Sequence, residues 1–307
     1  MRVAFFGSGA FGIPSLRKLI ELHDVRLIVT QPDRRAGRGS KLAPTPIAEL
    51  AAEIAPGIPV LKPERINTPE IREQVRAVET DIWVVIAYGQ KLGQKLLDGR
   101  SAVNLHASLL PRWRGAAPIN AAIVAGDTKT GTSVITLVDE MDAGDVLGTS
   151  ERVIEPSQTA GELHDLLAED GVVPLIRVLD EAHQDKLRPV AQDSLLVTLA
   201  PKIAREDARI DFTQSADRCR CLVHGYNPWP GVTVTLEGDP IKLLRVRALE
   251  ADGAGKPGEI TDSEAGIVRC GAGALQLLEV QPAGKKPMDW RAYIRGRSIR
   301  RGQHFVS

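Results

Sequence analysis

The sequence has 307 residues, of which 43% are hydrophobic, and this length and composition allow two folded domains with apolar cores. Lysine and arginine number 39 together, as do aspartate and glutamate, so the overall charge does not indicate a nucleic acid or membrane partner. A nucleic acid or membrane partner would have to be bound by a local basic patch. No signal peptide precedes the first apolar run, and no apolar stretch reaches the ~18 residues of a membrane span. We therefore expect a cytoplasmic protein without membrane contact.

The first half of the chain alternates apolar runs with stretches of helical period. We expect strands at residues 3–6, 24–30, 81–89, 101–107 and 132–138. We expect helices between them at residues 13–23, 45–55, 68–78, 90–98 and 117–125. This alternation predicts βαβ units and an α/β fold with a doubly wound, mostly parallel, Rossmann-like sheet. A longer helical stretch at 159–183, interrupted near Gly171 and Pro174, completes a domain that spans residues 1–185.

The pattern changes after residue 185. Residues 186–206 have no sustained period and contain two prolines, which predicts a linker. A helix at residues 215–225 opens the following domain and is followed by the rigid sequence NPWPG. Short β-rich runs separated by glycines then occur at residues 232–236, 241–249, 266–270 and 274–280. Short strands at this spacing predict a smaller, barrel-like domain over residues 207–307, similar to an OB fold.

The three cysteines leave one thiol unpaired in any disulfide arrangement. Cys219 and Cys221 are two residues apart on an expected helix, so their side chains point to different faces. We interpret these two and Cys270 as reduced packing residues rather than as metal ligands or a disulfide.

The first strand ends in G-x-G-x-x-G, formed by Gly7, Gly9 and Gly12, a sequence typical of dinucleotide-binding turns. Such sites also need an acidic residue at the end of the second strand, where it binds the ribose hydroxyls. That strand instead ends in the sequence TQP, and Asp33 follows the proline. We therefore favour a structural strand-to-helix turn. The arginines that follow could bind a 2′-phosphate, which keeps an NADP-dependent oxidoreductase as an alternative.

Polar side chains gather in the middle of the chain, around residues 103–120. Asn104 and His106 are two residues apart on an expected strand, so both side chains point to the same face. They lie near its carboxyl end, where open α/β sheets bind ligands. Asp142 lies in a turn just after the strand expected at 132–138. Each residue alone has a structural interpretation, whereas the three together form a candidate catalytic site.

These residues also carry a family resemblance. Asn104-x-His106, the segment SLLPRWRGAAPI at 108–119 and Asp142 together resemble the folate-dependent formyltransferases, and within them the enzymes that act on methionyl-tRNA. Similar segments run along the whole chain, namely QPDRRAGRGSKL, VVIAYGQKL, PKIAREDARIDF, NPWPG and QPAGKK. The family commonly has G-T-P in its first turn, where this chain has G-S-G at 7–9. It often has L-D-T-G-D where this chain has M-D-A-G-D at 141–145, which keeps the aspartate.

The resemblance implies an enzyme that transfers a formyl group from 10-formyltetrahydrofolate to the amino group of methionine on initiator methionyl-tRNA, for translation initiation. Such a transfer passes through a tetrahedral intermediate that carries an oxyanion, and it needs no metal. We assign Asn104 and His106 to stabilisation of the oxyanion. Asp142 orients His106 and relays protons. Which group is the formal base stays open.

The resemblance also implies a slot for the pterin ring of the folate. Backbone donors and acceptors at strand ends can pair with the ring while apolar side chains cover its faces. The residues expected to form this slot are Ala87, Tyr88, Gly89, Gln90, Lys91, Leu92, Ser108, Leu109, Leu110 and Pro111. The alternative for Tyr88 is a simple core aromatic.

Two basic runs are candidates for RNA contact. They comprise Arg34, Arg35, Arg38 and Lys41 in one expected loop, and Lys285 and Lys286 at the start of a cation-rich C-terminal segment. A solvated charge run is the ordinary interpretation. By resemblance, the loop 34–41 reaches the acceptor end of the tRNA through Arg38, and the second domain holds the tRNA body. We expect this loop to be mobile without RNA.

Three other functions stay open. A nucleotide-sugar N-formyltransferase would keep Asn104, His106 and Asp142, but would have less use for the basic loop and the second domain. An NADP-dependent oxidoreductase would use the first glycine turn, and a non-catalytic RNA-binding protein would not need the polar side chains. We expect a monomer.

Overall fold

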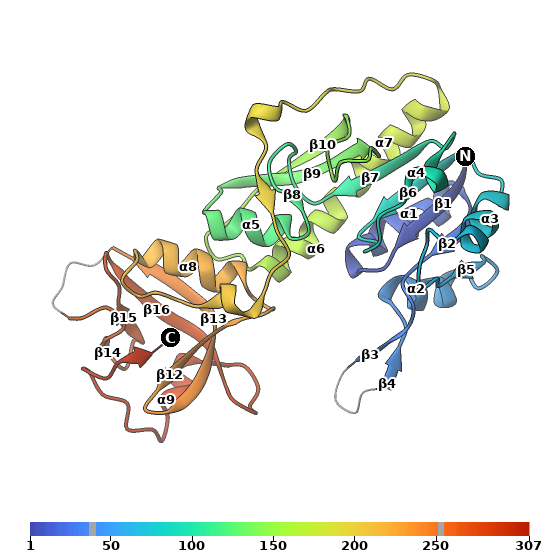
Figure 1. Cartoon of the computed structure of the whole chain (residues 1–307). Helices are drawn as coiled ribbons and strands as arrows, with labels where there is room; N and C mark the ends of the chain where they lie inside the picture. The colour runs from blue at the N-terminus through green and yellow to red at the C-terminus, as the bar shows by residue number, and fades with distance from the viewer. Residues whose placement is uncertain (37–40, 251–254, 307) are drawn as a thin grey trace. The chain divides into compact units, whose positions relative to one another are not determined.

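A computed structural model of the chain describes residues 1–36, 41–250 and 255–306 (Figure 1). The chain divides into two compact units that are not contiguous in sequence. The N-terminal unit comprises Met1–Gly115, Gly131–Arg152 and His164–Leu199, and the C-terminal unit comprises Ala116–Thr130, Val153–Leu163 and Ala200–Ser307. The boundaries at residues 185 and 206 expected from the sequence stay a prediction.

A seven-stranded sheet in the order β10-β9-β7-β6-β1-β2-β5 forms the centre of the N-terminal part. Its strands are β1 (Arg2–Gly7), β2 (Asp24–Val29), β5 (Val60–Leu61), β6 (Ile82–Ile86), β7 (Ala102–His106), β9 (Lys129–Thr136) and β10 (Val146–Val153). All pairs from β5 to β7 are parallel, whereas β9 runs antiparallel to β7. The mostly parallel α/β fold is therefore confirmed, and β10 is a strand that the sequence analysis missed.

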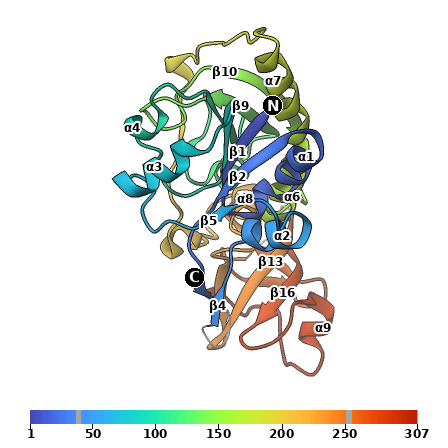
Figure 2. The same cartoon turned by 90° about the vertical axis from the view of Figure 1, so that its right-hand side faces the viewer.

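Helices cover both faces of this sheet. They are α1 (Ile13–Leu22), α2 (Pro46–Ile54), α3 (Pro69–Ala77), α4 (Gln94–Leu97), α6 (Ala160–Asp170) and α7 (Val172–His183). Figure 2 shows α3 and α4 on one side of β1 and β2, and α1 and α7 on the other. The stretch 159–183 is two helices separated at Gly171, as predicted, whereas Pro174 lies in the first turn of α7 and does not interrupt it. The helix expected at 90–98 is only the short α4, because the residues before it form a loop.

In the glycine-rich turn after β1, the backbone lies very close to the backbone at the end of β6. A Cβ on Gly7 would lie 2.5 Å from the Phe5 ring and 2.9 Å from the Ile86 carbonyl oxygen. The amides of Ser8 and Gly9 donate to the carbonyl oxygen of Ala87, at 3.2 and 3.4 Å. These N–H groups are therefore satisfied within the protein, which supports the structural turn over a phosphate-binding turn.

The basic segment after β2 is not simply a loop. Its flanks form β3 (Arg34–Ala36) and β4 (Lys41–Ala43), which pair antiparallel with Arg34 opposite Ala43. Residues 37–40, and with them Arg38 and the expected mobility of this loop, lie outside the described residues.

The C-terminal unit contains a curved antiparallel sheet in the order β14-β15-β16-β13-β12-β18, with β17 paired to β16. Its strands are β12 (Val232–Leu236), β13 (Asp239–Leu249), β14 (Ile260–Asp262), β15 (Ile267–Arg269), β16 (Ala274–Pro282), β17 (Met288–Asp289) and β18 (Phe305–Val306). The helices α5 (Pro118–Ala125), α8 (Ala216–Gly225) and α9 (Trp290–Ile294) accompany it. The predicted second β-rich domain is confirmed as a half-barrel.

The cysteines lie in the C-terminal unit as buried, free thiols. Cys219 and Cys270 belong to its hydrophobic core, together with Phe212 and Val223. This location agrees with their interpretation as packing residues. Within the described ranges, no group of three or more His, Cys, Asp or Glu side chains could hold a metal ion. No helix in that part of the chain is long and apolar enough to cross a membrane.

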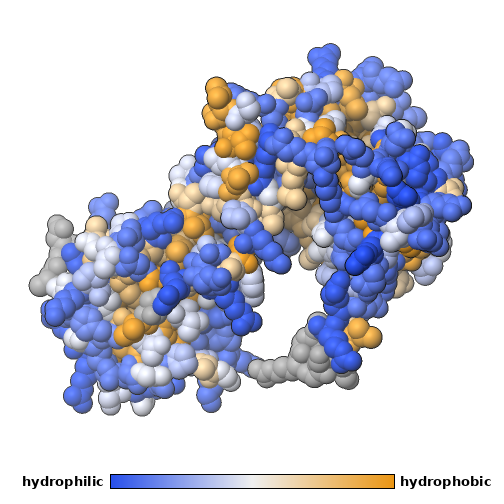
Figure 3. All heavy atoms as spheres, viewed as in Figure 1, coloured by the Kyte–Doolittle hydropathy of each residue, from blue (hydrophilic) through white to orange (hydrophobic). Residues whose placement is uncertain are grey.

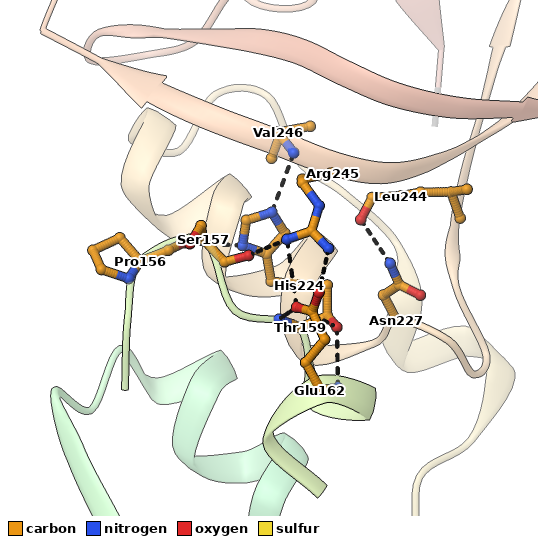
Figure 4. Close-up of polar contacts among 9 residues, drawn as sticks. All are labelled: Pro156, Ser157, Thr159, Glu162, His224, Asn227, Leu244, Arg245 and Val246. Atoms are coloured by element: carbon orange, nitrogen blue, oxygen red, sulfur yellow. Dashed lines mark hydrogen bonds and ion pairs between the residues drawn. The ribbon is translucent and has the colours of Figure 1, made fainter. Parts of the chain in front are cut away.

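A buried histidine explains why the segment Val153–Leu163 belongs to the C-terminal unit (Figure 4). His224 Nε2 accepts a hydrogen bond from the Val246 amide at 3.1 Å, so its Nδ1 carries the proton and donates to the Pro156 carbonyl oxygen at 3.1 Å. Beside it, Arg245 contacts the Glu162 carboxylate at 2.5 Å. Burial lowers the pKa of His224 to about 4, because the charged ring would lose its hydration.

We predict that this histidine makes the protein less stable in acid. In the unfolded chain a histidine takes up a proton near pH ~6.5, whereas folded His224 does so only near its pKa of about 4. The contribution of neutral His224 to the free energy of unfolding is therefore fully present above pH ~6.5 and is lost as the pH falls. The loss reaches about 2 kcal/mol at pH ~5. Urea unfolding of the wild type and of His224→Gln between pH ~7.5 and ~5 measures this term.

The variant His224→Gln should show a shallower loss of unfolding free energy with acid. The exposed His183 provides the matched control, and His183→Gln should follow the wild type. Equal pH dependence in all three proteins would contradict the assignment to His224.

Candidate active site

The strand β7 presents Asn104 and His106 on one face, as its period of two residues requires. Asn104 is half-buried and His106 is buried. Asp142 comes from the loop between β9 and β10, and its Oδ2 lies 3.6 Å from Nδ1 of His106. The structure therefore brings together the histidine and the aspartate that the sequence singled out, with the asparagine on the same strand.

Both ring nitrogens of His106 face acceptors. Nε2 lies 2.9 Å from the carbonyl oxygen of Trp113, which can only accept, so Nε2 is the donor. Nδ1 faces the Asp142 carboxylate at a distance longer than a hydrogen bond. Nδ1 therefore has no hydrogen-bond partner at Asp142 and can bond another group beside the carboxylate.

The loop that follows β7 holds both residues. The Gly115 amide donates to Oδ2 of Asp142 at 2.9 Å, and the Trp113 carbonyl binds His106. Asp142 has a φ of 53°, in the left-handed region that non-glycine residues seldom adopt. Such a conformation persists only where the surroundings fix it, which is common at functional sites.

Two residues that the sequence analysis assigned to the linker also reach this site. Gln192 Nε2 donates to the Asp142 carbonyl oxygen at 2.8 Å, and Thr198 Oγ1 accepts from the Trp113 amide at 2.9 Å. No periodicity surrounds either residue. In the sequence, each is simply a polar residue in an irregular stretch, which does not indicate a role at the site.

The first half of the expected folate slot follows β6. Ala87 and Gly89 have positive φ angles of 47° and 86°, so the backbone turns sharply there. The Tyr88 carbonyl oxygen accepts from Ser8 Oγ at 3.0 Å. Gln90 donates to the Pro63 carbonyl oxygen. These contacts hold the loop in place and leave its pterin-binding role a prediction.

The other expected slot residues are held in different ways. Lys91 pairs with Asp139 at 2.6 Å, and Leu92 is buried. In the second stretch, Ser133 Oγ donates to the Ser108 carbonyl oxygen at 2.7 Å and accepts from the Leu110 amide at 3.0 Å. Leu109 and Pro111, on either side of Leu110, are half-buried.

The Tyr88 side chain belongs to the core. Its ring is 2% exposed and packs edge-on against Phe6 at 5.9 Å between centroids. Its hydroxyl is buried and has no hydrogen-bond partner among the described residues, and burial raises its pKa. The side chain of Tyr88 is therefore a core aromatic, and the expected role of its backbone in pterin binding stays a prediction.

Removal of that hydroxyl should not harm the protein. A buried, unpaired polar group costs about 1–3 kcal/mol, so Tyr88→Phe should keep or raise the free energy of unfolding. Folate affinity should also be unchanged. Urea unfolding and folate titration of the variant measure both quantities, and a clear loss of folate affinity would show that the hydroxyl contacts the ligand.

The expected RNA-binding cations lie in both units. Arg34 and Arg35 are exposed on β3, and the Arg34 guanidinium is 3.8 Å from the Glu64 carboxylate. Lys285 and Lys286 are exposed after β16. Lys41 begins β4, while Arg38 is among residues 37–40, outside the described part.

Comparisons with known proteins cover both units. Residues 1–179 match the family described as formyl transferase, and residues 202–298 match the formyl transferase C-terminal domain. The methionyl-tRNA formyltransferase of Methylococcus capsulatus is 41% identical over 303 residues, which cover 97% of this chain and 98% of that protein. The methionyl-tRNA formyltransferase of Xylella fastidiosa is 42% identical over 305 residues, which cover 97% and 98%.

Solved structures with a similar fold are more distant in sequence. HypX from Aquifex aeolicus in complex with tetrahydrofolic acid has a TM-score of 0.64 at 18% identity, over 96% of this chain and 47% of that one. The N-formyltransferase from Helicobacter canadensis, in complex with folinic acid and dTDP-3-aminofucose, has a TM-score of 0.70 at 12% identity, over 92% and 99%. At these identities the likeness shows the fold alone.

Proposed function

The chain belongs to the methionyl-tRNA formyltransferases, and from this membership we propose how its own residues transfer a formyl group to the methionine of initiator methionyl-tRNA. Its relatives of that name match it over nearly the whole length at about 40% identity. The sugar N-formyltransferases match only in fold, at 12% identity. The enzyme therefore acts on methionyl-tRNA with a folate as the other substrate, and we propose 10-formyltetrahydrofolate as the formyl donor.

The observation that carries the proposed mechanism is the placement of His106 between the Asp142 carboxylate and the Trp113 carbonyl. The methionine amine attacks the formyl carbon, a C–N bond forms, and the carbonyl oxygen becomes an oxyanion. The bond from that carbon to the folate nitrogen then breaks, while the proton lost by the amine passes to the leaving nitrogen. No net charge or atom is left over.

We assign a separate task to each side chain. The Asn104 amide donates to the oxyanion without itself titrating. His106 Nδ1 forms no short hydrogen bond with Asp142, so when it carries a proton it can provide a second donor at the same oxygen. Asp142 keeps the imidazole oriented and relays the proton between the two nitrogens.

Substitution of these three residues should slow turnover while substrate binding survives. Loss of one oxyanion donor typically costs about 10²–10³ in turnover, so Asn104→Ala should show a loss of that order. His106→Ala and Asp142→Asn should also reduce turnover severely. The assay incubates 10-formyltetrahydrofolate with methionyl initiator tRNA and measures formylmethionine.

The matched control is Asp98→Asn, an exposed carboxylate at the end of α4 that should keep wild-type turnover. Near-normal rates in all three folded site variants would mean that the catalytic site is misplaced.

We also propose that the tRNA backbone contacts the cations Arg34, Arg35, Arg38, Lys41, Lys285 and Lys286. Lysine and arginine side chains attract phosphates whatever the sequence, and each contact makes binding depend on salt. The exposure of Arg34, Arg35 and the two C-terminal lysines supports this assignment. A monomeric state and a cytoplasmic location stay predictions.

Arg34→Ala should therefore slow formylation of tRNA much more than formylation of a small amine acceptor, which does not reach β3 and β4. The plot of log binding constant against log salt concentration should also become less steep, by the amount expected for the loss of about one phosphate contact. Arg26→Ala, on β2, is the control because Arg26 is an exposed arginine paired with Asp24. Equal losses of rate on tRNA and on the small amine would mean that Arg34 supports the folate site or the fold instead.

A further inference from the structure

The segment Val190–Thr198 was expected to be a linker, yet it contacts both loops of the candidate site. At its start, Val190 and Val146 exchange two backbone hydrogen bonds, at 2.8 and 2.9 Å. At its end, Thr198 bonds the loop that follows β7. The segment therefore lies against the loop that carries Asp142 and against the loop that binds His106.

Apolar packing does not explain how this segment is held. Leu195 and Leu196, in the short 3₁₀ turn Ser194–Leu196, are 90% and 59% exposed, and Leu199 just beyond is 70% exposed. Figure 3 shows hydrophobic side chains on the exposed surface of this part of the chain. Since these leucines gain little from burial, polar contacts must hold the segment in place.

Gln192 makes the most extensive of these polar contacts. Its Nε2 donates to the carbonyl oxygens of Asp142 and Gly144, at 2.8 and 2.7 Å. Its Oε1 accepts from Nε of Arg114 at 3.0 Å. The side chain therefore spans the turn at residues 142–144 with both of its N–H groups, while the acceptor end is fixed by an arginine.

Arg114 extends this contact to Glu140, two residues before Asp142. Its guanidinium also pairs with Glu140 at 2.9 Å, and its side chain is only 10% exposed. Gln192 therefore bonds the backbone at residues 142 and 144, and Arg114 connects Gln192 to Glu140, which precedes the same turn. Because Asp142 has positive φ, it needs such external contacts to keep its carboxylate directed at His106.

Thr198 holds the loop that follows β7 by similar hydrogen bonds. Besides its contact with Trp113, its carbonyl oxygen accepts from the Arg114 amide at 2.9 Å, and its amide donates to the Pro111 carbonyl oxygen at 3.3 Å. These bonds fix the carbonyl group of Trp113 that binds His106.

We propose that Val190–Thr198 is a strap on the active-site loops, in which Gln192 is a positioning residue for Asp142. In this role Gln192 acts through its hydrogen bonds to the carbonyl oxygens of Asp142 and Gly144, which orient the turn. This inference rests on the proposed catalytic role of Asp142. Misplacement of a reacting group by ~1 Å can cost about 10²-fold in rate, so loss of the contact is expected to reach kcat.

The sharpest variant is Gln192→Glu, which has the same length and still offers Arg114 an acceptor, but gives no N–H to the two carbonyl oxygens. Gln192→Ala removes both functions and serves if the first variant folds poorly. Gln184→Ala, an exposed glutamine after α7, is the matched control. We expect kcat to fall at least about tenfold in both Gln192 variants, with KM for tRNA and for folate within about twofold and an unchanged unfolding midpoint.

A double-mutant cycle separates this inference from the proposed function. If Gln192 acts through Asp142, Gln192→Glu should cause little further loss in an Asp142→Asn background. A full, multiplicative loss there, or a normal kcat for both single Gln192 variants while Asp142→Asn is inactive, would overturn the strap and leave the role of Asp142 intact. A near-normal rate for Asp142→Asn would instead overturn the proposed function itself.

Discussion

The candidate site depends on the main chain of one short loop. The carbonyl group of Trp113 binds one side of His106, and the amide of Gly115 binds the carboxylate that faces its other side. Because backbone groups set this geometry, the histidine and the aspartate are aligned before any substrate arrives. A site prearranged in this way needs little reorganisation free energy when charge develops on the reacting atoms.

Much of this arrangement could be predicted from the sequence where local rules apply. Asn104 and His106 share a face because any strand has a period of two, whatever surrounds it. The break at Gly171 and the cap-and-proline starts of α2 and α3 follow equally local chemistry, with Thr45 and Thr68 accepting from amides three residues on. Asp142 is a weaker candidate, because an aspartate in a turn after a strand is often an ordinary turn residue, and the family resemblance strengthens it.

The parts that the sequence did not predict depend on distant partners. Gln192 and Thr198 bond residues 50 and 85 positions away, and no window around either residue contains that information. The strand β10 has a mixed sequence, VLGTSERV, and buries few of its side chains, so its period is weak. The strands β3 and β4 have three residues each, too few to show alternation.

The discontinuous C-terminal unit has a consequence for how such enzymes can be recombined. His224 and Arg245 bond to Pro156, Ser157 and Glu162, which the chain supplies long before the half-barrel begins. Cutting or splicing near residue 206 would separate the histidine from its carbonyl acceptor and the arginine from its carboxylate. In evolution the half-barrel is therefore not a freely exchangeable module, because a chimaera must inherit matching residues at 156–162 along with it.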